Sequence, residues 1–301
     1  MLLVTGAPGF LGSAVVREVV RRGQKVRAMT RATSSLELLE PQKESIEIVQ
    51  ADMADAASLD AALQDVDAVV HCAATTSSSA PDLEISRKVN VEGTRALIEA
   101  MRKHGARRLI NISSQSAHPD NPSVYGQTKL EQDEVVQASE GIDWTILRPS
   151  IIYGPEEKGI FHKMVQHCRK LPAIPIIGSG KEEMRPVHVD DVAIASLDCI
   201  AHDATIGQIY DIGGADVLAF KDFIGELLKA LDQKKMRVHL PIPIAMLLAR
   251  TLSLLMKNPP LTPDNVTGIS TVKHVDISAA QRDFNFAPRK FTDGLNEIFK
   301  S

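Results

Sequence analysis

The chain opens with Met1-Leu-Leu-Val-Thr5, Gly6-Ala-Pro-Gly9-Phe-Leu-Gly12 and Ser13-Ala-Val-Val-Arg-Glu-Val-Val20, three runs of different character. The first is short, apolar and typical of a strand, whereas the third places apolar residues at helical spacing and is followed by Gly23. The glycines between them permit a tight turn and a close approach of a ligand to the backbone. Because a helix N-terminus presents unpaired N–H groups and the positive end of its dipole, the pattern predicts a pyrophosphate-binding strand–turn–helix. Its G-x-x-G-x-x-G spacing is one residue wider at the start than the common dinucleotide fingerprint.

Apolar strands and helices continue to alternate through the first half of the chain. The predicted strands cover residues 25–29, 46–50, 68–71, 108–112 and 144–147, and the predicted helices cover 56–63, 83–103 and 125–138. Strands separated by helices indicate a parallel sheet covered on both faces. We therefore predict an α/β fold, a doubly wound parallel sheet of the Rossmann type, over residues 1–150. Residues 151–301 mix short helices with a few strands and are expected to form a smaller substrate-binding lobe, with the chain crossing between the lobes more than once.

Tyr125 and Lys129 share one face of their predicted helix, and Ser113 and Ser114 precede Tyr125 by eleven to twelve residues. A free tyrosine has a pKa near 10, and a cation beside it favours the phenolate. A serine hydroxyl can bind the oxygen on which charge develops. These three groups suit the transfer of a proton at an alcohol or carbonyl oxygen. They supply no electron acceptor, so a cofactor has to take the hydride.

Several further segments match one family. They are Ala51-Asp52-Met53, His71-Cys-Ala-Ala74, Asn90-Val-Glu-Gly-Thr94, Leu147-Arg-Pro-Ser-Ile-Ile-Tyr-Gly-Pro155 and Arg185-Pro-Val-His-Val-Asp-Asp-Val-Ala193. With the glycine turn and the Tyr125–Lys129 pair, the chain resembles the extended branch of the short-chain dehydrogenase/reductase superfamily, the NAD-dependent epimerase/dehydratase family. The resemblance covers nearly the whole chain.

The resemblance implies a role for each site residue. Tyr125 is the catalytic acid/base, Lys129 lowers its pKa and holds the nicotinamide ribose, and Ser114 binds the substrate oxygen, with Ser113 as second choice. The expected cofactor-binding residues besides Lys129 and Arg31 are Gly6, Pro8, Gly9, Phe10, Leu11, Asp52, Met53, Ala73 and Ala74.

Cofactor preference can be argued from charge. A site for NAD places an acid at the end of the second strand to bind the ribose 2′-hydroxyl. Residues 27–34 contain no Asp or Glu, whereas Arg31 can pair with a 2′-phosphate and Thr33 or Ser34 can add hydroxyl groups. The alternative is that Arg31 only lies on a solvated loop. We expect NADP(H) to be favoured over NAD(H).

Two departures from the family pattern concern the substrate. Enzymes that act on nucleotide sugars usually carry a longer insertion between the serine and the tyrosine, and residues 156–161 lack the asparagine-containing segment common in them. A nucleotide-sugar epimerase or dehydratase therefore becomes the alternative to an NAD(P)-dependent oxidoreductase that acts on a secondary alcohol or ketone. Residues 141–149 are similar to compact members related to the nucleotide-binding accessory subunit of respiratory complex I. That likeness adds a second alternative, a structural or regulatory protein that holds NADP(H) without turnover.

The second half of the chain offers Arg185 and one apolar run. Arg185 can contact a substrate anion or serve packing, and we keep both interpretations. Residues 241–256 are too short to span a membrane and contain Arg250. We expect a helix that covers a pocket for an apolar carbonyl compound, with an interfacial helix that touches lipid as the alternative.

Composition limits the partners. At 301 residues with a net charge of −4, the chain has no basic footprint for nucleic acid. Cys72, Cys168 and Cys199 lack metal-ligand spacing, so we expect no metal and reduced thiols in a cytoplasmic protein. A signal peptide is not expected, because the cofactor strand begins at the first residues. The expected partner is a small-molecule substrate, and the expected state is a monomer or a homodimer.

Overall fold

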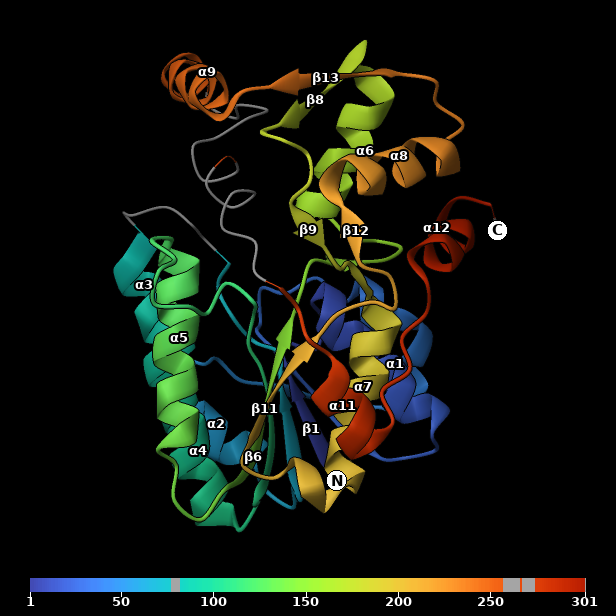
Figure 1. Ribbon diagram of the computed structural model, residues 1–301. Helices are drawn as coiled ribbons and strands as arrows, with labels where there is room; N and C mark the ends of the chain where they lie inside the picture. The colour runs from blue at the N-terminus through green and yellow to red at the C-terminus, as the bar shows by residue number, and fades with distance from the viewer. Residues whose placement is uncertain (77–81, 257–265, 267–273, 301) are drawn as a thin grey trace. The chain divides into compact units, whose positions relative to one another are not determined.

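The computed structural model describes residues 1–76, 82–256, 266 and 274–300, which fall into two compact units (Figure 1). Unit 1 comprises Met1–Ser150, Val189–Ile212 and Asp276–Ala287, and unit 2 comprises Ile151–His188, Gly213–Val275 and Pro288–Ser301. Unit 1 is therefore built from three separate stretches of the chain.

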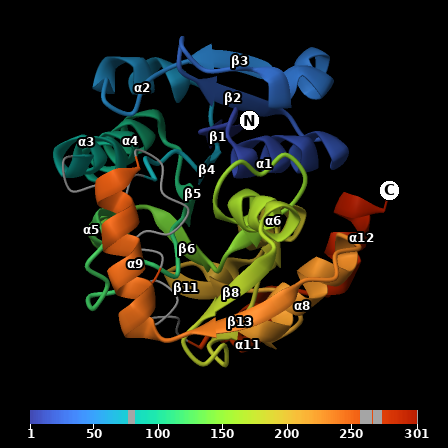
Figure 2. The same cartoon turned by 90° about the horizontal axis from the view of Figure 1, so that it is seen from above.

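Unit 1 is organised around a seven-stranded sheet in which every strand pair is parallel, with the strands in the order β11-β6-β5-β4-β1-β2-β3 (Figure 2). The strands are β1 Leu2–Thr5, β2 Val26–Thr30, β3 Glu47–Gln50, β4 Ala68–His71, β5 Arg108–Ile112, β6 Asp143–Pro149 and β11 Gln208–Ile212. The strand order reverses direction at β1, which confirms the doubly wound Rossmann-type sheet. Such sheets bind ligands outside the carboxyl ends of the strands at this reversal.

Helices cover both faces of the sheet, as a parallel sheet requires (Figure 1). They are α1 Phe10–Arg21, α2 Ala56–Ala62, α3 Leu83–Arg87, α4 Gly93–His104, α5 Val124–Gln137, α7 Val189–Ala201 and α11 Ser278–Phe284, with 3-10 segments η1 Glu37–Ser45 and η4 Asp203–Thr205. On one face, α7 packs along α1, and two ion pairs join them, Arg17–Asp190 at 2.6 Å and Arg22–Asp198 at 2.8 Å. On the other face, α2, α4 and α5 enclose the apolar core against the strands.

Two features of unit 1 depart from the expected elements. The seventh strand, β11, comes from beyond residue 150 and pairs with β6. The helix expected over 83–103 is interrupted by a π-helical turn, η3 Lys88–Glu92, in which Asn90 is fully buried. The Asn90 side chain accepts from the Thr75 N–H at 2.8 Å and donates to the Thr75 carbonyl at 3.1 Å, so it holds the loop after β4.

Unit 2 combines three two-stranded pairings with helices. Its elements are β7 Ile152–Tyr153, α6 Ile160–Lys170, β8 Ala173–Ile177, β9 Glu183–Met184, β10 Val187–His188, β12 Leu218–Ala219, α8 Phe220–Ala230, β13 Met236–Leu240, α9 Ile242–Leu255 and α12 Phe291–Phe299. The pairs are β7–β10 and β8–β13, both parallel, and β9–β12, which is antiparallel. Phe291 meets both Tyr153 and Phe223 in its core, with ring centroids 5.0 and 4.9 Å apart. This unit is the small mixed region that we expected from the second half of the chain.

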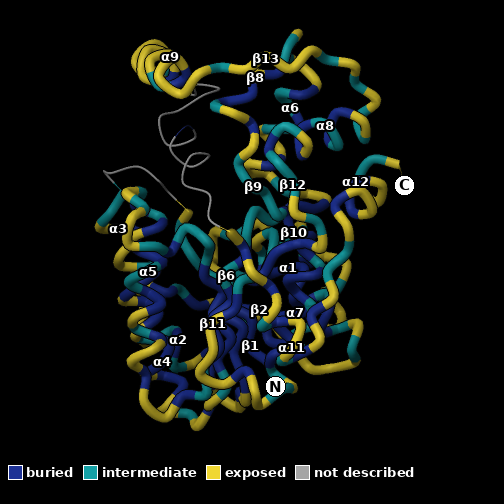
Figure 3. Tube along the Cα trace, in the orientation of Figure 1, coloured by how far each residue is buried: buried dark blue, intermediate teal, exposed yellow. Residues whose placement is uncertain are grey.

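The apolar run near residue 250 forms α9, of which much is exposed (Figure 3). Ala245 and Ala249 are its buried residues and pack with Ile177. Within the parts of the chain that the structure describes, no helix is both long and apolar enough to cross a membrane.

Candidate active site

The glycine turn between β1 and α1 has a shape that only glycine allows. Gly6 has φ +64°, and a Cβ placed on it would lie 2.8 Å from the Ala73 backbone. A Cβ on Gly12 would lie 2.1 Å from the Gly6 carbonyl oxygen, so the helix can pack against the turn only without a side chain there. Gly9 caps α1 without a side chain, and the first helical turn contains no acid. The end of α1 is therefore open to an anion, as a pyrophosphate requires.

The other residues expected to hold the cofactor follow the neighbouring strands at the same sheet edge. Ala73 and Ala74 come directly after β4, and the Ala73 N–H donates to the Thr5 hydroxyl at 3.2 Å. Asp52 and Met53 come after β3. All of these residues lie beyond the carboxyl ends of strands, together with Pro8, Phe10 and Leu11 in the glycine turn and the start of α1. Their placement matches that of a nucleotide site in a doubly wound sheet.

Arg31 follows the last residue of β2 and is exposed. Its backbone N–H donates to the Ser34 hydroxyl at 3.3 Å, and its guanidinium makes no ion pair within the described residues. The nearest acid along the neighbouring strand, Glu47, pairs with Arg27 at 2.7 Å. The guanidinium of Arg31 at the end of β2 is therefore not engaged by an acid of the neighbouring strand β3.

Tyr125 lies in the first turn of α5, which begins tightly against the preceding loop. Ser123 caps the helix by accepting from the Gly126 N–H at 3.0 Å. A Cβ on Gly126 would lie 2.5 Å from the Ser116 carbonyl oxygen, so this glycine lets the loop approach the helix. The Ser114 hydroxyl lies close enough to the Tyr125 phenol to lower its pKa, as the resemblance implies for two groups that share a substrate oxygen.

The two adjacent serines point to different partners. Ser113 is buried, and its hydroxyl donates to the Asp133 carboxylate at 2.8 Å. Asp133 also accepts from Arg148 at 2.9 and 3.0 Å. Ser113 thus belongs to a buried ionic cluster, whereas Ser114 faces Tyr125. The geometry supports Ser114 as the substrate-binding serine.

Lys129 is almost completely buried one turn after Tyr125. Its ammonium donates to the Ile112 carbonyl at the end of β5 at 2.6 Å, and to the side-chain oxygen of Gln132. Gln132 was not among the residues expected at the site. The signal that could have found it is its spacing, because position i+3 on a helix shares the face of position i.

A chain of buried polar side chains continues from Gln132 to the first strand. The Gln132 amide donates to Thr94 at 2.8 Å, and Thr94 contacts His71 at 3.0 Å. The other ring nitrogen of His71 lies 2.6 Å from the Thr5 hydroxyl. Burial and the charge of Lys129 lower the pKa of His71 to about 3, so the ring is neutral. The network therefore ties the helix of Tyr125 to the strand that leads into the glycine turn.

The pKa of Tyr125 differs in direction from the expectation. Burial raises the pKa of the phenol and the charge of Asp133 raises it further, while the hydrogen bond from Ser114 lowers it, with the rise prevailing. Burial also lowers the pKa of Lys129 to about 8, against the opposing effect of Asp133. In the protein alone the phenol is therefore held in its protonated, acid form.

Arg185 is engaged in unit 2. Its guanidinium donates to the Gly214 carbonyl at 2.8 Å and to the Val275 carbonyl at 2.7 Å. These contacts support the packing interpretation, and the substrate contact stays a prediction. Among the described residues, no three His, Cys, Asp or Glu side chains gather closely enough to hold a metal ion.

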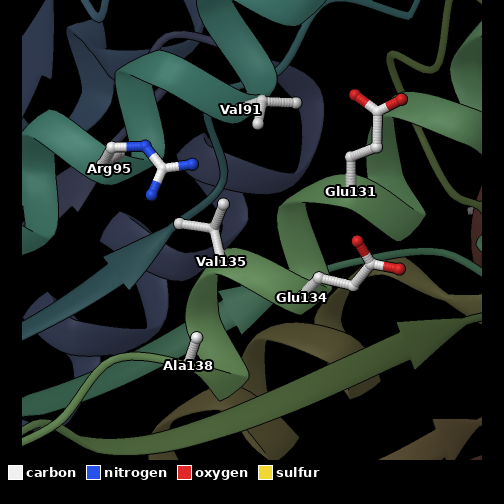
Figure 4. Close-up of a pocket in the computed structure, with 6 residues that line it drawn as sticks. All are labelled: Val91, Arg95, Glu131, Glu134, Val135 and Ala138. Atoms are coloured by element: carbon white, nitrogen blue, oxygen red, sulfur yellow. The ribbon is translucent and has the colours of Figure 1, made fainter.

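A shallow open hollow lies between α5 and the helical segment η3–α4 (Figure 4). Its lining residues are Val91, Arg95, Glu131, Glu134, Val135 and Ala138. None of them belongs to the expected site, which lies at the sheet edge and the start of α5.

Three similarities to characterised proteins bear on this arrangement. The chain is 26% identical to 2-alkyl-3-oxoalkanoate reductase of Stenotrophomonas maltophilia, over 99% of this chain and 98% of that protein. It is 28% identical to 3 beta-hydroxysteroid dehydrogenase/Delta 5→4-isomerase of Mycobacterium tuberculosis, over 80% of this chain and 72% of that protein. The crystal structure of DesIV, a dTDP-glucose 4,6-dehydratase from Streptomyces venezuelae, superimposes with a TM-score of 0.78 at 24% identity, over 99% and 95% of the two chains, and shows the same fold.

The model of the NAD dependent epimerase/dehydratase family matches residues 2–213, which include the glycine turn, Ser114, Tyr125 and Lys129. This match extends from β1 through β11 and so covers the whole parallel sheet. The chain belongs to the NAD-dependent epimerase/dehydratase family.

Proposed function

We propose that the protein is an NADP(H)-dependent oxidoreductase that interconverts a ketone and a secondary alcohol on an apolar compound. The observation that carries the proposal is the closeness of Ser114 to the Tyr125 phenol, whose pKa it lowers, with Lys129 buried on the same helix. Two hydroxyl groups that lie next to each other can contact one substrate oxygen together. This pair is the part of the site that acts on the substrate.

The residues at the sheet edge fit a dinucleotide. Gly6, Gly9 and Gly12 leave room for the pyrophosphate at the start of α1, and Arg31 offers its guanidinium to a 2′-phosphate. Lys129 is the residue that holds the nicotinamide ribose. The bound nicotinamide supplies or accepts the hydride.

Tyr125 moves the proton at the substrate oxygen. In the reductive direction, its phenol donates a proton to the carbonyl oxygen, and Ser114 donates a hydrogen bond to the same oxygen. In the oxidative direction, the phenolate accepts the proton of the alcohol. Because burial raises the pKa of Tyr125, the phenol is protonated in the protein alone, which is the form that the reductive direction needs.

The relatives support the substrate class. Their names specify a 2-alkyl-3-oxoalkanoate and a 3 beta-hydroxysteroid, compounds that carry a carbonyl or hydroxyl group on a largely hydrocarbon skeleton. The shortness of the segment between Ser114 and Tyr125 agrees with this class, because the longer insertion of nucleotide-sugar enzymes is missing. The likeness to a dTDP-glucose 4,6-dehydratase keeps the sugar-nucleotide enzyme as the second candidate. A non-catalytic NADP(H)-holding protein is the third, and an intact Ser114–Tyr125 pair argues against it.

The experiment combines one substitution with a substrate screen. Purified protein is assayed for NADPH oxidation with 2-alkyl-3-oxo acids and steroid ketones, and its stabilisation by these compounds and by dTDP-glucose is measured as a shift in Tm. Tyr125→Phe should reduce turnover by about 10²- to 10⁴-fold, because the proton-transfer group is lost while the ring still packs. NADPH affinity, measured by fluorescence titration, should stay unchanged. Normal turnover by Tyr125→Phe on an established substrate would refute the assignment, and stabilisation by the sugar nucleotide alone would favour the epimerase or dehydratase.

A further inference from the structure

In helix α9 of unit 2, small side chains face the core and large apolar side chains face outward. The small residues Ala245 and Ala249 are fully buried. Leu247 and Leu254, on the opposite side, are 67% and 87% exposed. A helix of a globular protein normally turns its large apolar residues toward the core. The inward face of α9 packs against the rest of unit 2. The large side chains of the outward face take no part in that packing within the described structure.

The outward face is continuous along the helix. Residues spaced by three, four and seven positions share one side. Those exposed on this side are Ile244, Leu247, Leu248, Thr251, Leu254 and Leu255. Nine of the fifteen exposed large hydrophobic residues found in the described part of the chain lie from Met236 to Met256, that is, in β13, in α9 and at the residue that follows α9. Scattered apolar residues need no explanation, but a concentration of this kind marks an interaction surface.

The segment of the chain that carries this face has charges of one sign. Residues 233–263 contain five lysines and arginines and no acid. On the scale of the whole unit, unit 2 carries 17 Lys and Arg against 11 Asp and Glu, a net formal charge of +6, whereas unit 1 carries 17 against 27, a net −10. The apolar face therefore belongs to the basic half of an acidic protein. A partner that covers it has to be apolar and negatively charged.

We propose that α9 is a membrane-docking helix that lies in the surface of an anionic lipid bilayer. Its 14 residues are too few to span a bilayer, and Arg250 near its middle stays at the level of the headgroups. The leucines of the outward face insert among the acyl chains, and basic residues such as Lys234 and Arg250 contact the lipid phosphates. A second copy of the chain fits less well as the partner, because two copies of unit 2, each with a net formal charge of +6, repel each other. The proposal does not rest on the proposed function.

The test is flotation of the full-length protein with vesicles of phosphatidylcholine alone or with 30% phosphatidylglycerol. The protein should float with the anionic vesicles, about tenfold or more better than with the neutral ones, and salt should weaken the binding. Leu247→Glu with Leu254→Glu should lower binding by about tenfold or more, since both side chains are already exposed and their loss leaves the fold intact. Lys234→Gln with Arg250→Gln should remove the preference for anionic vesicles. The matched control is Ile85→Glu, which changes a 61% exposed residue of unit 1 and should leave binding unchanged.

Each other outcome overturns the proposal. Equal binding by the double leucine variant would place the contact elsewhere. A failure to float with anionic vesicles at low salt would remove lipid as the partner. If the wild-type protein were a dimer in analytical ultracentrifugation and the double leucine variant a monomer that binds lipid no worse, the face would be an interface between copies. Loss of turnover in that variant without any vesicle binding by the wild type would show that α9 covers a substrate.

Discussion

Replacement of Lys129 by methionine tests whether burial lowers the pKa of its ammonium group. The quantity measured is the pH dependence of the free energy of unfolding. Lys129 is 1% exposed, and its pKa falls from the ordinary 10.5 to about 8 in the folded protein. Between these two values the unfolded chain binds the proton more tightly than the folded one. Stability should therefore rise as the pH increases from about 8 toward 10.5, while below pH 8 the full penalty for burying the charge is present.

The magnitude follows from the two pKa values. Each pH unit between them corresponds to 1.36 kcal/mol, so the complete effect is about 3 kcal/mol. From pH 7.5 to 9.5, Lys129 should contribute a gain of about 2 kcal/mol in the free energy of unfolding. Lys129→Met leaves Ile112 and Gln132 without their donor, but that loss is present at every pH and cancels when the two pH values are compared. The variant should therefore gain about 2 kcal/mol less than the wild type over this interval.

The assay is urea unfolding at 25 °C at pH 7.5 and 9.5 for both proteins. Lys103→Met is the control, because that ammonium is 66% exposed and its removal should leave the pH profile of the wild type unchanged. Parallel profiles for the wild type and Lys129→Met would mean that Lys129 titrates like a solvated lysine, and the buried network around it would have to be abandoned.

Three further substitutions separate the parts of the site. Gly12→Ala places a Cβ 2.1 Å from the Gly6 carbonyl oxygen and should abolish cofactor binding, seen as loss of the NADPH-induced shift in Tm. Arg31→Asp should weaken NADPH by about one to two orders of magnitude and NADH far less, since a charge-assisted bond is worth roughly 1.5–3 kcal/mol; equal losses in titration would show that Arg31 does not contact the phosphate. Ser114→Ala should lower kcat with little change in Tm, whereas Ser113→Ala should lower Tm, because Ser113 donates to buried Asp133; the reverse pattern would exchange their roles.

The strands of the unit 1 sheet could be predicted where a local sequence pattern corresponds to the local structure. Strands β1 to β6 alternate with helices, and each has a short apolar core. Strand β11 was not predicted, because its sequence, Gln208-Ile-Tyr-Asp-Ile212, mixes polar and apolar residues. Its first two residues are exposed at the sheet edge. Nothing in that segment indicates that it pairs with β6, some sixty residues earlier. The pairing arises from tertiary packing, which a local pattern does not encode.

The residue types of the site could be predicted from the sequence. The side chains that each of them contacts could be predicted less well. The spacing of Tyr125 and Lys129 places them on one helix face, as found. Which of two adjacent serines faces Tyr125 depends on where Asp133 lies, and Asp133 reaches Ser113 only through folding. The direction of the Tyr125 pKa was missed for a similar reason. Burial raises the pKa of Tyr125 more than Ser114 lowers it, and burial is a property of the folded chain.

The three-part construction of unit 1 has a consequence for how the protein is made. When residue 150 leaves the ribosome, β6 is still an open edge strand and the outer side of α1 is bare, because β11 and α7 have yet to be synthesised. At 5–20 residues per second, this intermediate persists for roughly 3 to 12 s before residue 212 is made. An unpaired edge strand is a template for aggregation, so chaperones that bind nascent chains should recognise this stage. For the same reason, a gene fragment that encodes only residues 1–150 should yield insoluble protein, although it contains the glycine turn, Ser114, Tyr125 and Lys129.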